Sequence, residues 1–545
     1  MPDPKTLSNR LSLRLAEWQN QRRIAGLAWQ VAAQAQPQPG QPPVVFFNAS
    51  TRLAGLSLNA AFSLLASWGL RLAGAPVVHF VSRSGLSRCV LGTNREDYHL
   101  PPPCEACIAQ SERLYAKADV RWFTYAPHPG LVAALKDLSI EALGDFEYEF
   151  SASSQLSGIP LGRLVLPSMR WALRRHHLPD DEPTRYLFRE YILSAYNAAK
   201  EFCDLMGRAN PAALVLFNGM MYPEAAVGWA ARQRGLRVIT HEVSFQRYSA
   251  FFTEGEATAY PLQIPKDFEL NAVQNTRLDD YLEKRFQGKF TMAGIRFWPE
   301  MRGLDEAFLQ KAAGFCQVVP VFTNVIFDTS QVHANTVFSH MFAWLDLVLD
   351  LIRCHPETLF VIRAHPDEMR PGTSKQSRES VREWVQRNRV DALPNVVFID
   401  SQEYISSYEL IGRAKFVIVY NSSIGMEATL LGAPVLCGGK ARYTQVPTVF
   451  FPQTPEAYRE QAEVFLAAEQ IDVPPEFVRN ARRFLYYQLF RTSLPFDAYL
   501  EAASKPGFVR LRQFAWRALL PENSATMQVI RDGVLHGKPF LLDGE

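Results

Sequence analysis

The sequence lacks long apolar runs, a signal peptide and an excess of charge of one sign. In 545 residues we find no run near the roughly eighteen apolar residues that a membrane-spanning helix needs, and the N-terminal segment MPDPKTLSNRLSLRLAEWQNQRR has no apolar core. Lys and Arg number 57 against 55 Asp and Glu, so the formal net charge of +2 creates no global field that favours nucleic acid. These absences predict a cytoplasmic protein, peripheral to the inner membrane face at most, with no nucleic-acid partner.

Cysteine is also scarce. The seven cysteines are an odd number scattered over a long chain, which does not suggest a disulfide framework. One group stands out in a proline-broken loop, where three thiolates and one imidazole would complete a tetrahedral zinc site. Its members are Cys89, His99, Cys104 and Cys107. Since only the last two have CxxC spacing, the alternative is a loop of buried, reduced cysteines.

Short runs of β-branched and aromatic residues alternate with longer helical patterns, which is typical of βαβ units and parallel sheets. The strands expected in the first half are VVFFN (44–48), VVHFVS (77–82), VRWFTY (120–125), ALVLFN (213–218) and RVITHE (237–242). Those expected in the second half are QVVPVFT (317–323), LFVIRA (359–364), VVFID (396–400), FVIVY (416–420) and APVLC (433–437). The second set is nearly continuous in apolar residues, so it predicts a parallel sheet buried on both faces.

Composition divides the chain into four segments. Residues 1–43 are expected to form a helix and a Pro/Gln-rich linker. Residues 44–310 predict a Rossmann-like domain with helical insertions, and residues 311–455 predict a second one. Residues 456–545 read as mainly helical, without a further strand series, and should pack back on both domains. The predicted class is α/β, with two Rossmann-like domains facing a central cleft and a C-terminal helical extension.

Polar motifs follow two strands of the second domain, at the strand ends where doubly wound sheets bind ligands. LFVIRA leads into His365 and Pro366, and the proline favours an extended backbone that leaves the imidazole at the strand tip. An imidazole there can donate to a phosphate oxygen. Many His-Pro pairs merely end a strand, so this motif alone is weak.

FVIVY leads into the motif NSSIG and then into a helix. The motif contributes Asn421, Ser422, Ser423 and Gly425. Hydroxyls and free amides at a helix start suit a phosphate, although a plain helix N-cap is the alternative. Because we expect the strands before the two motifs to be adjacent, their conjunction predicts a nucleotide-sugar site.

Three further residues are assigned to this nucleotide site. Glu427, one turn into the helix, can accept hydrogen bonds from a ribose, but an acid in a first turn also simply favours the helix dipole. Gly438 and Gly439 follow the next strand, where missing side chains let backbone amides approach a ligand. A turn is the equal alternative for the glycine pair.

With these motifs, residues 317–450, and more faintly 212–265, resemble the capsule polysaccharide transferases that use CMP-Kdo. Bacterial sialyltransferases and CDP-glycerol polymerases are similar in pairing an HP with an SS motif around a cytidine nucleotide. The resemblance implies the GT-B glycosyltransferase fold, with CMP held by His365, Pro366, Ser422 and Ser423. It implies transfer of Kdo or a related acid sugar to a capsular, surface or lipid-linked acceptor. A CMP-sugar has a single phosphate, so we expect no cofactor or metal to be required for catalysis.

The Kdo transferases carry a Q-x-x-x-D sequence whose aspartate is implicated in chemistry. The matching stretch here is NVIFD, in which Asn324 replaces the glutamine and Asp328 is retained. The resemblance gives Asp328 the role of attacking or stabilising the anomeric carbon. An ordinary N-cap of the next helix is the alternative.

A transferase also needs a group that removes a proton from the acceptor hydroxyl. In the first domain, the strand RVITHE ends on His241 and Glu242, and Glu224 opens a helix after Pro223. These strand ends should face the cleft between the domains. We rank Glu242 first, because an acid is expected in a first helical turn in any case.

Two further interpretations stay open. The segment LGRLVLPSMRWALRRHH (161–177) resembles a basic interfacial helix that meets lipid or an anionic glycan, or it is a solvated basic face on a buried helix. The HP and serine-rich layout is also similar to UDP-GlcNAc 2-epimerases, which bind UDP. A UDP-sugar enzyme and a noncatalytic glycan-binding assembly subunit are therefore the alternative functions.

Overall fold

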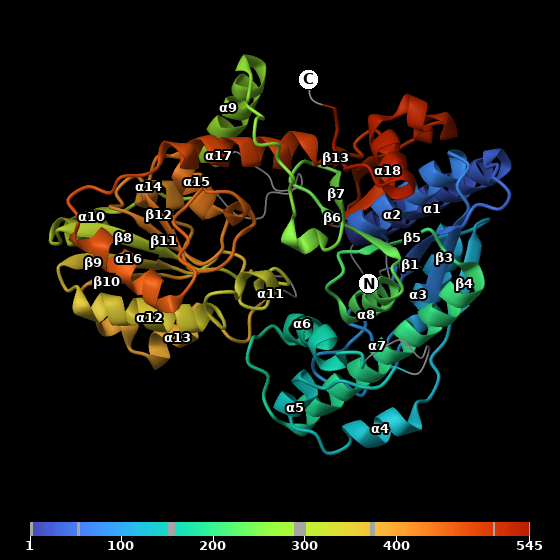
Figure 1. Ribbon diagram of the computed structural model, residues 1–545, viewed down its shortest axis with the longest axis horizontal. Coiled ribbons are helices and arrows are strands. Elements are labelled where there is room, and N and C mark those ends of the chain that lie inside the picture. The colour runs from blue at the N-terminus through green and yellow to red at the C-terminus, as the bar shows by residue number, and fades with distance from the viewer. Residues whose placement is uncertain are drawn as a thin grey trace.

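The computed structural model describes residues 4–51, 55–150, 158–287, 301–370, 376–504 and 507–543. They form two α/β lobes that lie side by side, as Figure 1 shows: the N-terminal lobe in blue and green and the C-terminal lobe in yellow and orange. Residues 288–300, near the end of the predicted first domain (44–310), lie outside the described residues. Each lobe is built on one sheet, so the two-lobe architecture expected from the strand patterns is confirmed.

The N-terminal lobe contains a seven-stranded sheet in the order β13-β7-β6-β5-β1-β3-β4. The strands from β6 to β4 along this order are parallel, whereas β7 and β13 join antiparallel at one edge. The strands are β1 (Val44–Asn48), β3 (Val77–Ser82), β4 (Asp119–Phe123), β5 (Ala213–Phe217), β6 (Arg237–Val243), β7 (Ser249–Glu254) and β13 (Leu494–Pro495). All five strands expected in this half are present, and β7 was not predicted.

The C-terminal lobe contains a five-stranded, wholly parallel sheet in the order β10-β9-β8-β11-β12. Its strands are β8 (Gln317–Phe322), β9 (Thr358–Arg363), β10 (Val396–Ile399), β11 (Val417–Val419) and β12 (Val435–Cys437). The order corrects one expectation: the strands that precede the HP and NSSIG motifs, β9 and β11, are not neighbours, because β8 lies between them. Sequence order alone does not determine which parallel strands pair.

Both sheets are buried on both faces, as their continuous apolar strands require. In β1, Val45 and Phe47 belong to one core cluster, whereas Val44 and Phe46 belong to the cluster on the opposite face. The strands of the C-terminal lobe divide in the same way between two clusters. Every central strand therefore needs helices above and below it.

Helices supply this cover in the N-terminal lobe. They are α1 (Pro4–Gln34), α2 (Leu58–Leu72), α3 (Cys104–Leu114), α4 (Pro129–Leu135), α5 (Ile140–Gly144), α6 (Leu161–Leu173), α7 (Glu182–Ala209) and α8 (Tyr222–Gln233). The start of α7 follows from the sequence, because the Asp181 side chain caps the helix by accepting from the Thr184 amide and proline lies in the first turn.

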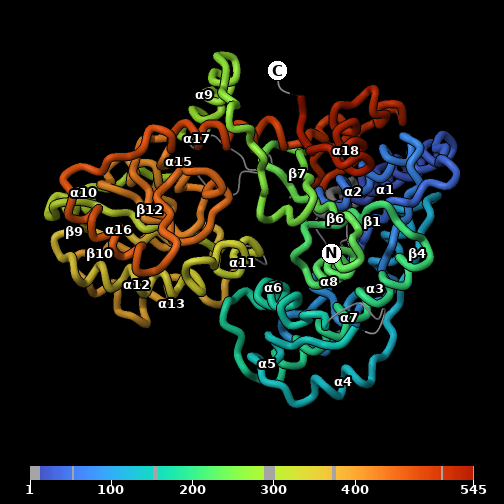
Figure 2. Tube along the Cα trace, viewed as in Figure 1, coloured from blue at the N-terminus to red at the C-terminus, as the bar shows by residue number. Residues whose placement is uncertain are grey.

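The C-terminal lobe has its own helices, and the chain then returns to the first lobe. The helices from α9 onward are α9 (Ala272–Phe286), α10 (Glu306–Ala313), α11 (Gln331–Ala334), α12 (Met341–Cys354), α13 (Val381–Arg387), α14 (Ser407–Ile411), α15 (Ile424–Leu430), α16 (Pro455–Ala467) and α17 (Pro475–Tyr486), and α18 (Ala525–His536) belongs to the return. Figure 2 follows the return, in which the red end of the trace passes through α17 to α18 beside α2.

The C-terminal return is less helical than expected. It contributes β13 to the N-terminal sheet, and a small third sheet is formed by β14 (Leu500–Ala502), β15 (Phe508–Leu511) and β2 (Leu56–Ser57). These strands have two to four residues, too short for an alternating pattern to be recognised. Within the described residues, the helices are too short or too polar to cross a membrane.

Candidate functional site

The carboxyl ends of three neighbouring strands bring polar side chains together in the C-terminal lobe. His365 follows β9, Asn324 follows β8 and Asn421 follows β11, and the central position of β8 places Asn324 between the other two. The Asn324 amide donates to Asn421 Oδ1 over 2.7 Å. Since paired strands lie about 4.8 Å apart, the three side chains span roughly 10 Å along this edge. We call it the donor edge.

His365 is oriented by its own loop. Its Nδ1 accepts from the Asp367 amide over 3.1 Å, so the proton of the neutral ring lies on Nε2. Burial lowers the pKa of His365, while the nearby charges of Asp367 and Asp328 act against that shift. A neutral imidazole with a fixed Nε2–H can donate to a ligand oxygen. Pro366 is half-buried beside it, as the HP motif predicts for a strand tip.

The two serines of NSSIG differ in exposure. Ser422 is buried, and its carbonyl accepts from the Tyr443 hydroxyl over 2.8 Å. Ser423 is exposed, and its hydroxyl donates to Glu427 over 3.3 Å. Gly425 is required by packing, because a Cβ there would lie 2.3 Å from the Tyr443 hydroxyl oxygen. The joint grip of His365 and both serine hydroxyls on one phosphate stays a prediction.

Glu427 is engaged within the protein. One carboxylate oxygen accepts from Arg285 over 2.5 Å, and the other accepts from the Tyr408 hydroxyl over 2.6 Å. The Arg285–Glu427 ion pair is buried, so breaking it would leave a buried charge without its partner. The geometry accounts for Glu427 structurally, and its contact with a ribose stays a prediction.

The glycine pair after β12 does not present free amides, which corrects the reason given for it. The Gly438 and Gly439 amides donate to the carbonyls of Val419 and Tyr420 over 2.8 Å each. A Cβ on Gly438 would lie 2.4 Å from the Trp344 ring, and one on Gly439 would lie 3.0 Å from the Tyr420 ring. Close aromatic packing, which depends on residues distant in sequence, explains both glycines.

Asp328 is exposed and lies where the lobes face each other. It does not cap α11, whose N-cap is Ser330; instead its Oδ1 accepts from the Ser330 amide over 2.9 Å. Asp328, Phe327 and neighbouring residues of the C-terminal lobe share a small hollow with Arg170 and His176 of the N-terminal lobe. Burial lowers the pKa of Arg174 from that lobe to about 9, and the charge of Asp328 opposes this lowering. Since its charge also acts on His365, Asp328 lies near both the donor edge and the opposite lobe.

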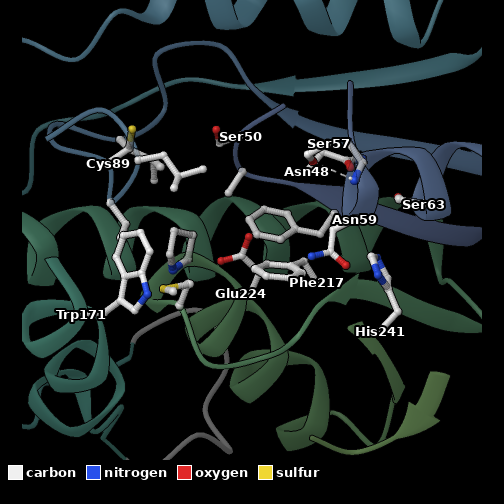
Figure 3. Close-up of a pocket in the computed structure, with 18 of the residues that line it drawn as sticks. Asn48, Ser50, Ser57, Asn59, Ser63, Cys89, Trp171, Phe217, Glu224 and His241 are labelled. Carbon is white, nitrogen blue, oxygen red and sulfur yellow. Dashed lines mark hydrogen bonds between the residues drawn. The ribbon is translucent and has the colours of Figure 1, made fainter. Parts of the chain in front are cut away.

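A second site lies at the carboxyl edge of the N-terminal sheet. A pocket there is lined mainly by apolar and aromatic side chains from β1, α2, α6, β5 and the start of α8. Figure 3 shows the Glu224 carboxylate pointing into it between Trp171 and Asn59, with His241 at one side. Glu224 is buried, and it reaches the pocket because α8 begins immediately after the β5 loop. We call this pocket and the adjoining end of β6 the acceptor edge.

Glu242 lies at the end of β6 in a cage of donors. Its oxygens accept from the Asn59 and Asn218 amides over 3.1 and 3.2 Å and from the Val243 amide over 2.8 Å. Burial raises the pKa of Glu242, and these hydrogen bonds and the charge of Arg442 partly offset the rise. Arg442 belongs to the C-terminal lobe, so the first-ranked carboxylate lies close enough to that lobe to be influenced by its charge.

His241 is less suited to catalysis than Glu242. It is buried in β6 and stacks on Phe252 at a centroid distance of 5.2 Å. Burial lowers the pKa of His241 to about 3, so the ring is neutral at physiological pH and binds protons weakly. Its catalytic role stays a prediction, but a general base with so low a pKa would be a weak one.

The predicted zinc ligands do not assemble as a set. His99 is exposed and stacks on Tyr186 at 4.0 Å, and Cys89 accepts from the Gly92 amide. Cys104 and Cys107 line a small cavity with Cys89. Among the described residues, the group whose ligand atoms all lie within 4.8 Å of one another consists of His176, His177 and His340. The CxxC spacing places Cys104 and Cys107 together on α3, but it carries no information on the position of His99, which stacks on Tyr186.

Within the basic segment 161–177, residues 161–173 form α6, which packs inside the protein and is not an interfacial helix. Its Leu161, Val165 and Met169 are buried in the core against α7 and α8. Arg174 is also buried, with its guanidinium 4.1 Å from the Trp171 ring and 4.9 Å from Phe327 of the other lobe. The apolar face that would enter a lipid layer is therefore already used inside the protein.

Residues 299–461 match the family model described as capsule polysaccharide biosynthesis protein. Curated proteins give no match. Solved structures that match include two transferase units of Thermosulfurimonas dismutans KpsC. Its β-Kdo 2,4 transferase is 11% identical with a TM-score of 0.32, over 52% of this chain and 80% of that chain. Its β-Kdo 2,7 transferase is 14% identical with a TM-score of 0.31, over 62% and 90%.

A UDP-GlcNAc 2-epimerase from Neisseria meningitidis, bound to UDP-GlcNAc, also matches at 12% identity and a TM-score of 0.23, over 82% of this chain and 99% of that chain. The matched family region contains β8 to β12 and the whole donor edge. Together with the two α/β lobes, the family match supports the glycosyltransferase of GT-B type that the motifs predict. Residues 299–461 thus resemble the capsule polysaccharide biosynthesis family, and this match covers the donor edge.

Proposed function

We propose that this protein transfers Kdo or a related acid sugar from a CMP-linked donor to a capsular, surface or lipid-linked glycan acceptor. One observation carries the proposal: His365, Asn324 and Asn421 lie on adjoining strand ends inside the region that matches the capsule biosynthesis family. Their position is the one at which open α/β sheets bind nucleotides. Asp328 lies beyond the same edge, on the side of the other lobe.

In this proposal the donor edge binds the leaving nucleotide. The Nε2–H of His365 donates to the phosphate, and the exposed hydroxyl of Ser423, turned from Glu427 to the ligand, is a second donor. The α15 helix has only seven residues, so we assign the main role to side chains and not to its dipole. Donors fixed before the reaction stabilise the negative charge that develops on the departing phosphate. The exposed Asp328 stabilises the positive charge on the anomeric carbon, or attacks it.

The acceptor edge supplies the base. Glu242 is ranked first because its pKa is raised by burial and its carboxylate is held in place by Asn59 and Asn218. Glu224 is the second carboxylate, directed into the pocket. A base with a pKa raised towards the working pH accepts a proton from a sugar hydroxyl more effectively than one with an ordinary carboxylate pKa.

The preference for CMP rests on the HP and SS motifs and on the single phosphate of CMP-sugars. The test is to incubate the purified protein with CMP-Kdo and a capsular or lipid-linked acceptor, and to measure CMP release and the mass of the product. Parallel reactions contain UDP-GlcNAc. We expect CMP release that depends on acceptor and a product heavier by one acid sugar. Epimerisation of UDP-GlcNAc, or transfer from a UDP-sugar alone, would contradict the proposal.

A noncatalytic glycan-binding subunit predicts a different pattern. Such a protein would bind the acceptor without releasing CMP from any donor. Acceptor binding can be measured separately by calorimetry, so binding without turnover across a panel of accepted glycans would replace the transferase proposal. The EDTA-treated protein should retain its transferase activity, since the proposed chemistry uses side chains alone.

A further inference from the structure

Three imidazoles meet where the two lobes face each other. His176 and His177 follow α6 in the N-terminal lobe, and His340 is the N-cap of α12 in the C-terminal lobe. Each offers a ring nitrogen within 4.8 Å of the nitrogens of the other two. The ring centroids are 4.7 to 4.9 Å apart in all three pairs. Neither the sequence motifs nor the proposed transferase chemistry accounts for this group, which we call the seam histidines.

The remaining hydrogen bonds orient two of the rings. His340 Nδ1 accepts from the Ala343 amide over 3.1 Å, so without an ion the proton of the neutral ring lies on Nε2. Binding an ion through Nε2 moves this proton to Nδ1 and gives up the N-cap hydrogen bond. His177 Nδ1 lies 2.5 Å from Glu379 Oε1, so that nitrogen carries the proton and Nε2 has a lone pair. A carboxylate behind a histidine in this way is the usual outer partner of a metal ligand, because it fixes the tautomer and the ring plane.

The third ring supplies an independent observation. His176 is 6% exposed, and its Nδ1 is buried without a hydrogen-bond partner among the described residues. Buried polar nitrogens nearly always have a partner, so an unpartnered one beside two other imidazoles indicates a missing ligand. The Glu379 carboxylate also fixes the backbone here, accepting from the His176 and His177 amides over 2.9 and 3.0 Å.

Charged groups of both signs surround the three rings. The cation nearby is Arg170, whose Nε donates to the His176 carbonyl. Glu379 and Asp346 supply the opposing negative charge around the rings.

We propose that His176, His177 and His340 bind one divalent transition-metal ion, best fitted by Zn²⁺, which joins the N-terminal lobe to the C-terminal lobe. Three imidazoles leave a fourth tetrahedral position for water. Imidazole ligands favour Zn²⁺, Ni²⁺ or Cu²⁺ over Mg²⁺ and Ca²⁺. Because the ligands come from both lobes, the ion would hold the lobes in one relative orientation. This role is independent of the proposed sugar transfer.

The surrounding contacts show that the lobes already meet at this seam. The Arg378 amide donates to the Arg174 carbonyl over 2.8 Å, and Arg175 donates to the Arg378 carbonyl over 3.2 Å. These bonds place segment 174–177 against segment 377–379. A bound ion would add a link between segments that are held here mainly by hydrogen bonds and aromatic contacts.

The experiment uses the full chain, stripped of metal with a chelator, and Zn²⁺ as the probe. Calorimetry with a competing chelator measures stoichiometry and affinity, and Co²⁺ provides a visible spectrum that reports tetrahedral nitrogen ligands. We expect one ion per chain and a higher melting temperature with Zn²⁺ than without it. Replacing the outer partner by Glu379→Gln should weaken binding by about 10- to 100-fold. Loss of a ligand by His177→Ala or His340→Asn should weaken it at least as much.

The variants are chosen so that folding and binding separate. His340→Asn keeps an acceptor for the N-cap, His177 is exposed, and the control His536→Ala removes an exposed histidine far from the seam. X-ray absorption of the zinc-loaded wild-type protein should find three imidazole nitrogens, which tests the site even if a variant fails to fold. Equal affinity in wild type and both ligand variants would overturn the proposal. So would the absence of stoichiometric binding, or an equal loss in His536→Ala.

Discussion

The carboxyl edges of the two sheets differ in what they offer a ligand. The donor edge presents polar side chains that are half-buried or exposed, with His365 and Asn421 on strand tips. The acceptor edge is mostly apolar: Glu224 is buried among aromatic side chains of the pocket, and Glu242 is half-buried with a raised pKa. A polar edge suits a charged and strongly hydrated nucleotide. An apolar edge with little water raises the pKa values of its carboxylates, which suits the removal of a proton from a neutral hydroxyl.

The largest effect is expected from Glu242→Gln, because it removes the proton acceptor but keeps the shape and the hydrogen bonds to Asn59 and Asn218 partly intact. We expect kcat to fall by about 10²- to 10⁴-fold with little change in donor KM. Steady-state kinetics with saturating acceptor measure this. Glu254→Gln, an exposed carboxylate at the end of β7, is the control. If Glu224→Gln alone abolishes turnover, the base is in the pocket and the ranking of the two carboxylates is wrong.

The pH dependence of kcat sharpens the same comparison. A general base must be deprotonated, and burial raises the pKa of Glu242 above its usual value of 4.5. The acid limb of the kcat profile should therefore lie above pH 4.5, and kcat should fall as pH decreases through the raised pKa. In the residual activity of the Glu242→Gln variant, the acid limb of the kcat profile should be absent. A limb that persists unchanged in that variant would assign it to another group.

At the donor edge, His365→Ala removes a hydrogen bond to a charged phosphate. Such bonds contribute about 1.5–3 kcal/mol, so donor kcat/KM should fall roughly 10- to 150-fold while acceptor KM changes little. The matched control is His355→Ala, a histidine of the same lobe that pairs with Glu357 and Glu463 away from the strand tips. Equal losses of donor kcat/KM in the two variants would mean that the His365 substitution disturbs the fold and does not remove a contact with the donor.

Gly438→Ala separates packing from ligand binding at the donor edge. The added Cβ would lie 2.4 Å from the Trp344 ring, so we expect a loss of about 1–3 kcal/mol in the free energy of unfolding. Denaturant unfolding measures this free energy. Gly432→Ala is not a suitable control, because Gly432 has a positive φ that an alanine would strain. Ala468→Gly, at the half-buried residue just after α16, is a milder comparison. A normal stability with a raised donor KM would restore the original role of the glycine pair in approaching the nucleotide.

The smallest effect concerns a buried carboxylate of the donor lobe. Burial raises the pKa of Glu368 to about 8, and its Oε2 has no hydrogen-bond partner among the described residues. The folded state therefore keeps a proton that the unfolded state loses above about 4.5, so stability declines as pH rises from 4.5 to 8. Glu368→Gln should be more stable than wild type at pH 9, by at least about 1 kcal/mol. Parallel pH dependence in both proteins would contradict this.

Much of the fold could be predicted because its central strands are buried on both faces and therefore read as continuous apolar runs. All ten expected strands are present, within about two residues at each end. The antiparallel β7 was missed because SAFFTE follows β6 across a short turn without a glycine signal. β13 to β15 were missed because two to four residues carry no period. The order of β9, β8 and β11 in the sheet depends on which strands pair, and local sequence patterns do not predict this pairing.

The sites show the same limit. His365 and the residues after β11 could be found because each directly follows a recognisable strand. The Arg285–Glu427 pair joins residues 142 positions apart, and Arg442 influences Glu242 from the other lobe. The seam histidines come from two lobes, and the HH pair alone gave no sign of His340. Local sequence patterns predict strand tips well, whereas partners across the lobes require the folded arrangement.

The central claim is that the donor edge binds the cytidine nucleotide through His365. Isothermal titration of the wild-type protein and of His365→Ala with CMP and with UDP tests it most directly. We expect the wild type to bind CMP more tightly than UDP, and the variant to bind CMP at least about tenfold more weakly, from the loss of one charge-assisted hydrogen bond. Equal CMP affinity in both proteins, or a preference for UDP, would contradict the account.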